Sequence, residues 1–116
     1  MKKIMILEDD LDIRNVMGIV LSDTYQVLMV KDIENWEQRL TEYAPDLILL
    51  DIKLGVANGI EIAQSIRKEP TTGHIKIILT TASVYSSTTD GFSDGFLEKP
   101  FEIEYLQNMV ADALNG

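Results

Sequence analysis

The chain contains the stretch PDLILLD at residues 45–51, in which four consecutive apolar residues lead directly into an aspartate. An apolar run without polar alternation is typical of a strand that is covered on both faces, as in a parallel sheet between helices. Residues 4–7 (IMIL) and residues 75–80 (IKIILT) have the same character. These three runs predict the central strands of a parallel sheet.

Shorter strands and amphipathic stretches fill the intervals between these runs. Apolar residues at helical spacing predict four helices, and two further apolar segments predict outer strands. The helices are expected at residues 11–22, 32–43, 58–68 and 102–114, and the outer strands at residues 25–30 and 95–98. Asp32 and Asn58 are the expected N-caps of the second and third helices. Strands that alternate with helices predict a doubly wound five-stranded parallel α/β sheet with helices on both faces.

Composition restricts the functions that this chain can have. Its 116 residues fit one domain, and the absence of cysteine excludes thiolate catalysis and zinc–thiolate sites. The formal net charge of −9 opposes direct binding to nucleic acid or to an anionic membrane. The basic start is followed by only four apolar residues, which is too short for a secretory signal, so a cytoplasmic location is expected.

Polar side chains follow the predicted strands at the edge of the sheet where parallel strands end. Glu8 and Asp9 follow the first strand, Asp51 the third, Thr81 the fourth and Lys99 the fifth. Ligands of open parallel sheets bind at this edge. Two carboxylates about 4 Å apart repel by about 4 kcal/mol at an effective dielectric constant near 20, so a cation is needed to hold them together. Oxygen ligands of this kind select a hard ion such as Mg²⁺.

The order of these motifs resembles the receiver domain of two-component response regulators over essentially the whole chain, residues 1–116. The resemblance rests on residues 3–10 (KIMILEDD), 45–51 (PDLILLD), 79–82 (LTTA) and 97–101 (LEKPF). It implies a flavodoxin-like sheet with strand order 2-1-3-4-5. It also implies that the peptide bond between Lys99 and Pro100 is cis.

The resemblance further implies a phosphoacceptor signalling domain rather than an enzyme that turns over a separate substrate. Asp51 would take a phosphoryl group from a sensor histidine kinase or a histidine phosphotransfer protein, and slow hydrolysis would reset it. Thr81 would contact a phosphoryl oxygen and Lys99 would balance its charge. A downstream effector protein would read the phosphorylated state.

The same resemblance supplies the expected magnesium ligands. Asp9, Asp51 and the backbone carbonyl of Lys53 would hold the ion, with Glu8 acting directly or through water. The side chains of Lys53 and Ser83 would flank the path of the attacking water and set the rate of hydrolysis.

The sequence departs from the family pattern between Thr81 and Lys99. This interval is shorter than the family norm by about one helical turn, and its residues 86–91 (SSTTDG) are poor helix formers. The fourth helix of the family is therefore expected to be shortened or absent, with residues 84–94 mobile until phosphorylation or partner binding. By the same resemblance, Thr81 and Phe96 occupy the two switch positions of the family, which carry a hydroxyl and an aromatic ring. Phe96 lacks a phenolic hydroxyl.

Two other functions each fit part of the sequence. A phosphorylation-independent pseudo-receiver, acting as a protein-interaction module, would suit the altered fourth helix but not the intact set of acids, threonine and lysine. A phosphatase of the haloacid dehalogenase type would use Asp10 and Asp12 as an Asp-x-Asp motif. That pair falls in the predicted helix rather than at a strand end, and the chain is too short for a cap domain.

Overall fold

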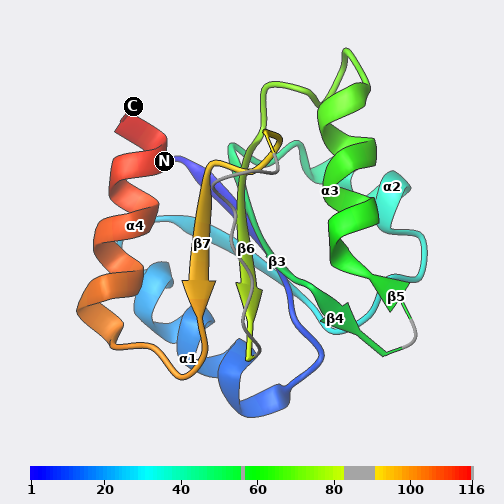
Figure 1. The fold of residues 1–116 in the computed structure, drawn as a ribbon. Coiled ribbons are helices and arrows are strands. Elements are labelled where there is room, and N and C mark those ends of the chain that lie inside the picture. Colours follow the sequence, from blue (N-terminus) through cyan, green and yellow to red (C-terminus); the bar gives the residue numbers. More distant parts are fainter. Residues whose placement is uncertain (56, 83–90, 116) are drawn as a thin grey trace.

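A five-stranded parallel sheet forms the centre of the molecule. The computed structural model describes residues 1–55, 57–82 and 91–115. Its sheet strands are β1 (Lys3–Leu7), β2 (Gln26–Val30), β3 (Leu47–Asp51), β6 (Lys76–Thr81) and β7 (Gly95–Glu98). They lie in the order β2-β1-β3-β6-β7, all parallel (Figure 1). The predicted order 2-1-3-4-5 is therefore confirmed.

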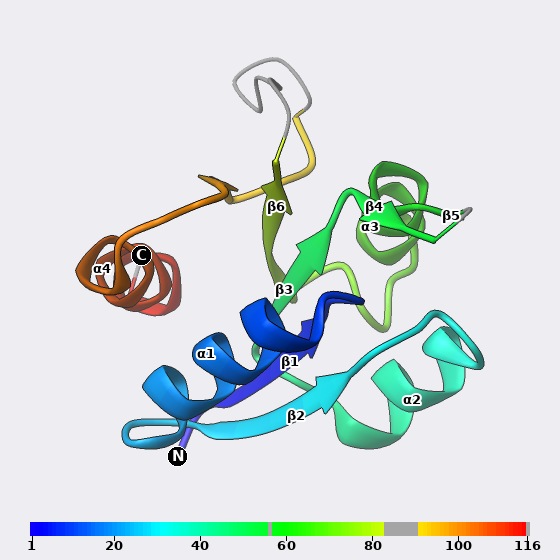
Figure 2. The ribbon, with the colours of Figure 1, turned by 90° about the horizontal axis from the view of Figure 1, so that it is seen from below.

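Helices cover both faces of this sheet, as Figure 2 shows. The described residues form α1 (Leu11–Ser22), α2 (Trp36–Tyr43), α3 (Gly59–Lys68) and α4 (Ile103–Asn115). Alternate strand residues supply two separate cores. Ile4 and Ile6 pack with α1 and α4, whereas Met5 and Leu7 pack with α2 and α3. Burial on both faces explains why the central strands are continuous apolar runs.

Side-chain caps account for where two of the helices begin. Asp10 accepts a hydrogen bond from the Ile13 N–H at 3.0 Å at the start of α1, and Asn58 accepts one from the Ile60 N–H at 2.8 Å at the start of α3. The Asp10–Asp12 pair thus lies at the start of a helix, away from the position that an Asp-x-Asp phosphatase requires.

The predicted cap at Asp32 is wrong, because α2 begins four residues later at Trp36. The Asp32 carboxylate accepts a hydrogen bond from the Glu34 N–H at 3.0 Å, which closes a turn before the helix. Asn35 then takes a left-handed conformation with φ of 56°, so the helical backbone can only start after it.

A two-stranded antiparallel hairpin, β4 (Lys53–Leu54) with β5 (Ala57–Asn58), follows β3 and was not predicted. The segment expected to contain a shortened fourth helix falls largely on residues 83–90, which lie outside the described residues.

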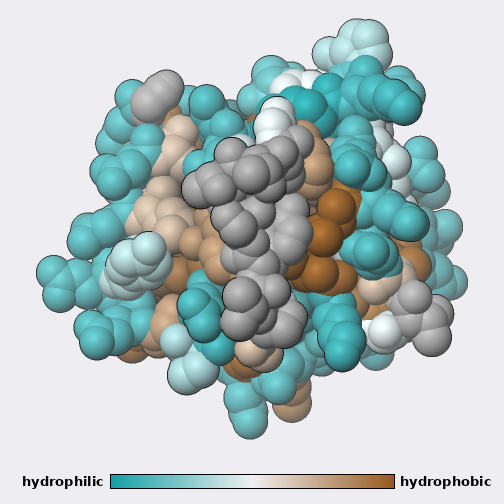
Figure 3. Space-filling view, viewed as in Figure 1, coloured by the Kyte–Doolittle hydropathy of each residue, from teal (hydrophilic) through white to brown (hydrophobic). Residues whose placement is uncertain are grey.

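Hydrophobic surface gathers near the middle of the view in Figure 3, whereas the outer parts over α3 and α4 are mainly hydrophilic.

Arg67 fixes the chain where it enters β7. Its guanidinium donates hydrogen bonds to the carbonyl oxygens of Phe92 (2.9 Å), Gly73 (2.6 Å) and Ile75 (3.0 Å). It also forms an ion pair with Asp94 at 2.6 Å, and the same carboxylate accepts the Ile77 N–H. One side chain on α3 therefore ties the starts of β6 and β7 together.

Candidate functional site

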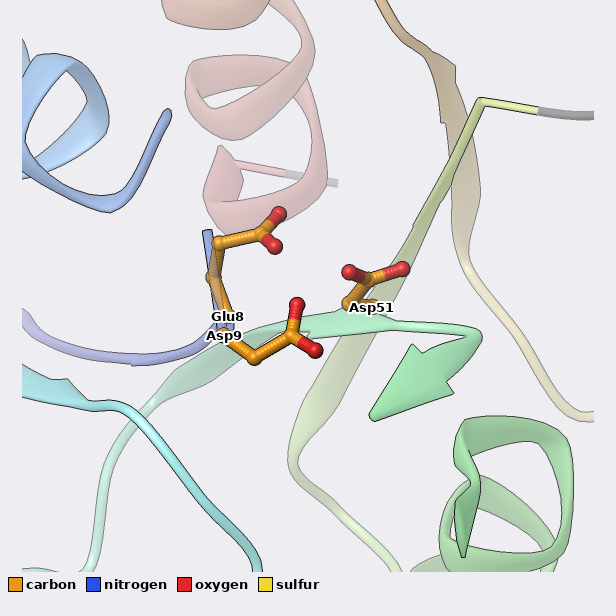
Figure 4. Close-up of side chains that lie close together, drawn as sticks. All are labelled: Glu8, Asp9 and Asp51. Atoms are coloured by element: carbon orange, nitrogen blue, oxygen red, sulfur yellow. The ribbon is translucent and has the colours of Figure 1, made fainter. Parts of the chain in front are cut away.

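Three carboxylates meet at the carboxyl edge of the sheet. Glu8 directly follows β1 and Asp51 ends β3, and these two strands are neighbours (Figure 4). One oxygen from each of Glu8, Asp9 and Asp51 lies within 4.8 Å of the others. Glu8 and Asp51 are only 1% and 3% exposed, whereas Asp9 faces solvent. Parallel pairing of the strands thus produces the convergence that the sequence predicts.

Lys99 supplies positive charge to this cluster. Its Nζ lies 3.0 Å from Glu8 Oε1 and 3.0 Å from Asp51 Oδ2. Burial alone would lower the pKa of Lys99, but its hydrogen bonds to Asp51 and Glu8 outweigh burial and raise it. The lysine is therefore held in its charged form. The peptide bond from Lys99 to Pro100 is cis, as the resemblance implied.

Glu8 has the most strongly altered acidity in the cluster. Burial raises its pKa to about 7, and the neighbouring Asp51 carboxylate adds to the rise. The backbone N–H of Asp10, 3.1 Å from Oε2, and the Lys99 ammonium act in the opposite direction. One lysine is therefore too little positive charge for this group of acids.

The geometry fits a divalent hard cation. Oxygen ligands of Mg²⁺ lie 2.0–2.1 Å from the ion, so two of them are at most about 4.2 Å apart. The three carboxylate oxygens all lie within 4.8 Å of one another, so a small movement of the side chains would bring them to this spacing. With three acids and one lysine the fully ionised cluster carries a formal charge of −2, which a divalent ion would balance.

Backbone groups hold the two aspartates in place. The Lys53 N–H donates to Asp51 Oδ1 at 3.1 Å, and the Gly55 N–H donates to Asp9 Oδ2 at 3.3 Å. Both donors come from the β4–β5 region, which follows Asp51 directly. Gly55 has a positive φ of 61°, a backbone conformation that glycine adopts without strain.

Two residues that sequence reasoning missed support the site. A Cβ on Gly59 would lie 2.1 Å from the Asp51 backbone oxygen, so α3 can pack against the strand end only because residue 59 has no side chain. Arg14 on α1 donates to the Glu8 backbone oxygen at 2.9 Å. Neither contact has a sequence signal, because each depends on how a helix packs against the end of the strand before it.

The remaining predicted residues surround this centre. Thr81 ends β6, is 3% exposed, and its backbone oxygen accepts the Lys99 N–H at 2.7 Å. Phe96 on β7 is partly buried against the core that α2 and α3 cover. Lys53 is exposed, and Ser83 lies outside the described residues.

Comparison with known proteins agrees with this architecture. The sequence model of the response regulator receiver domain matches residues 4–111. The transcriptional regulatory protein CiaR of Streptococcus pneumoniae is 33% identical over 113 residues, which cover 95% of this chain and 50% of CiaR. The chemotaxis protein CheY of Halobacterium salinarum is 23% identical over 99% of this chain and 98% of its own.

A solved structure described as the BeF3-activated DrrB receiver domain superposes with a TM-score of 0.86 at 28% identity, covering 100% of this chain and 99% of that one. The chain therefore belongs to the response regulator receiver domain family of two-component systems. It spans half the length of CiaR and nearly the full length of the halobacterial CheY. Within the described residues, no helix is long and apolar enough to cross a membrane.

Proposed function

We propose that this chain is a phosphoacceptor signalling domain in which Asp51 receives a phosphoryl group from a phosphohistidine. The observation that carries this proposal is the buried group of Glu8, Asp51 and Lys99 at one strand edge, with Asp9 beside it. A structural role alone does not explain why two nearly buried carboxylates share one lysine. The partners that fit this chemistry are a sensor histidine kinase or a histidine phosphotransfer protein, with an effector protein downstream.

In the proposed reaction an Asp51 carboxylate oxygen forms a bond to phosphorus as the bond from phosphorus to the donor's imidazole nitrogen breaks. The transferred group carries negative charge on three equatorial oxygens. Lys99 Nζ, already 3.0 Å from Asp51, would pair with one of them, and the Thr81 hydroxyl would donate to another. Hydrolysis of the aspartyl phosphate returns the free carboxylate, so the chain acts only on itself.

Glu8, Asp9, Asp51 and the Lys53 carbonyl would hold Mg²⁺, which supplies charge neutralisation for the phosphoryl oxygens when it is bound. The intact cluster supports this function over a pseudo-receiver, because an interaction module has no need of a polar group that is costly to bury.

The test is phosphorylation by a small phosphodonor, acetyl phosphate, in the presence of Mg²⁺. Wild-type protein should give an intact-mass increase of one phosphoryl group, and Asp51→Asn should give none. Asp12→Asn, which changes an exposed aspartate of the α1 first turn, is the matched control and should be labelled like wild type. Undiminished labelling of Asp51→Asn would show that the phosphoacceptor lies elsewhere, and no labelling of either wild type or control would favour the pseudo-receiver.

A further inference from the structure

A groove lies between α2 and α3, the two helices that cover the face of the sheet opposite α1 and α4 in Figure 2. It consists of two hollows of about 380 Å³ and about 400 Å³, and both are lined by Trp36 and Ser65. Because the hollows share these two walls, they adjoin. The acids, threonine and lysine of the phosphoacceptor site line neither hollow.

The groove has an apolar floor and polar rims. Leu40, Ile62 and Ile66 form the floor and are 2%, 6% and 1% exposed. Trp36, the only tryptophan, is partly buried at the junction of the two hollows. Because these three side chains are already almost fully covered, a ligand in the groove would contact mainly Trp36 and the polar rims.

The charges on the rims have one sign. Glu37 on α2, Glu61 on α3 and Glu69 just after α3 line the groove and are exposed. Across residues 1–55, 57–82 and 91–115, none of these three carboxylates lies within 4 Å of a cationic group. Within the described residues these three carboxylates therefore have no ion-pair partner and can accept cations of a ligand.

We propose that this groove binds an extended basic segment of a partner protein. Glu61 and Glu69 are eight residues apart along α3 and its end, which corresponds to about 12 Å at 1.5 Å per residue. Four residues of extended chain span about 13 Å. Cationic side chains at the first and fifth positions of such a segment would thus match these two acids.

The third side chain of the segment points to the same side as the first and fifth. Ser65 lies midway between Glu61 and Glu69 in sequence and shares both hollows with Trp36. A cation at the third position would therefore lie near the indole, which attracts positive charge through its ring face. The expected motif is three Arg or Lys residues at alternate positions.

The probe is the peptide Ac-Arg-Ala-Arg-Ala-Arg-NH2, titrated against the 116-residue protein. Binding is followed by Trp36 fluorescence and by amide chemical shifts. Two triple variants are compared, each with a formal charge of −6 because three carboxylates are removed from −9. The groove variant carries Glu37→Gln, Glu61→Gln and Glu69→Gln. The control variant, with three exposed acids of the α4 region changed, carries Glu102→Gln, Glu104→Gln and Asp112→Asn.

The groove variant should bind about tenfold more weakly than wild type, a loss expected from three partly exposed ion pairs. The control variant should bind within about twofold of wild type, and shifted amides should fall in residues 33–41 and 57–72. An equal loss in both variants would show that only net charge attracts the peptide and would overturn the proposal. Shifts concentrated on α1 or α4 would also overturn it. Because the variants change exposed carboxylates to isosteric amides, circular dichroism should show the same fold in all three proteins.

Discussion

Replacing Glu8 with glutamine should stabilise the metal-free protein at alkaline pH. The pKa of Glu8 is about 7 in the folded chain against an ordinary value of 4.5. Between these values the folded state binds more protons than the unfolded state, so stability falls as pH rises from 4.5 towards 7. The difference corresponds to about 3 kcal/mol of unfavourable free energy, fully present above pH 7. Glu8→Gln mimics the protonated side chain at every pH and removes this loss.

The measurement is urea unfolding at pH 5, 6, 7 and 8 with EDTA, followed by fluorescence. Wild type and Glu8→Gln should have similar stability at pH 5, and the variant should be more stable by about 3 kcal/mol at pH 8. Glu102→Gln, which changes an exposed carboxylate outside the cluster, should show the same pH dependence of stability as wild type. A stability difference that stays constant from pH 5 to pH 8, or that reverses sign, would refute the assignment of the raised pKa to Glu8.

The same proton should compete with the cation. Mg²⁺ requires Glu8 ionised if Glu8 contributes to the site, so apparent affinity should be about tenfold weaker at pH 6 than at pH 8. Glu8→Gln should bind Mg²⁺ more weakly at pH 8 and lose most of this pH dependence. An affinity that is independent of pH in wild type would show that Glu8 does not take part in binding the ion.

Three substitutions test other contacts of the structure. Lys99→Met should leave two nearly buried carboxylates without their cation. We expect it to lower the free energy of unfolding in urea at pH 8 by about 3 kcal/mol and to abolish acetyl phosphate labelling. A stability within about 0.5 kcal/mol of wild type, the size of a neutral surface change, would contradict the pairing of Lys99 with Glu8 and Asp51. Gly59→Ala should lower the free energy of unfolding by about 1–3 kcal/mol and slow labelling, because the added Cβ would lie 2.1 Å from the Asp51 backbone oxygen. Unchanged stability and labelling would show that α3 can move away freely. Arg67→Met should lower the free energy of unfolding by about 2–4 kcal/mol, because Arg67 loses its backbone carbonyl and Asp94 partners. Amide hydrogen exchange at the start of β7 should become faster, and exchange equal to wild type would refute the role of Arg67 there.

The parallel sheet with helices on both faces could be predicted from sequence because burial on both faces leaves a direct trace, the uninterrupted apolar runs, whereas the strand order followed from the resemblance to receiver domains. The position of the acids followed from the same runs, since a charge that directly ends a buried strand must lie at the sheet edge. Met29 shows what apolar character alone does not decide. It lies in the predicted outer strand at residues 25–30 and is 47% exposed, because β2 is an edge strand and the Met29 sulfur lies over Gly18 of α1.

Other features had no clear signal in the sequence. Asp32 had the residue type of a helix cap, but its carboxylate closes a turn with the Glu34 N–H and α2 begins only at Trp36. Arg67 resembled an ordinary basic residue in the last turn of a helix, but it reaches residues 92 and 94 across the sheet. Gly59 resembled part of a cap motif, and only the approach of α3 to the Asp51 backbone shows why a side chain cannot be present.

The ends of β3, β6 and β7 around Asp51 are connected by hydrogen bonds, and these connections determine which strand responds when the charge at Asp51 changes. The Ile52 N–H donates to the Thr80 oxygen at 2.9 Å, and the Lys99 N–H donates to the Thr81 oxygen at 2.7 Å. Lys99 also bonds to Asp51 directly, so β3 and β7 are connected both through β6 and through one side chain. When an Asp51 oxygen is bonded to phosphorus, Lys99 must find its partner among the phosphoryl oxygens. Because the backbone of Lys99 is held by Thr81, we expect that adjustment to reach β7, and with it Phe96, before any other strand.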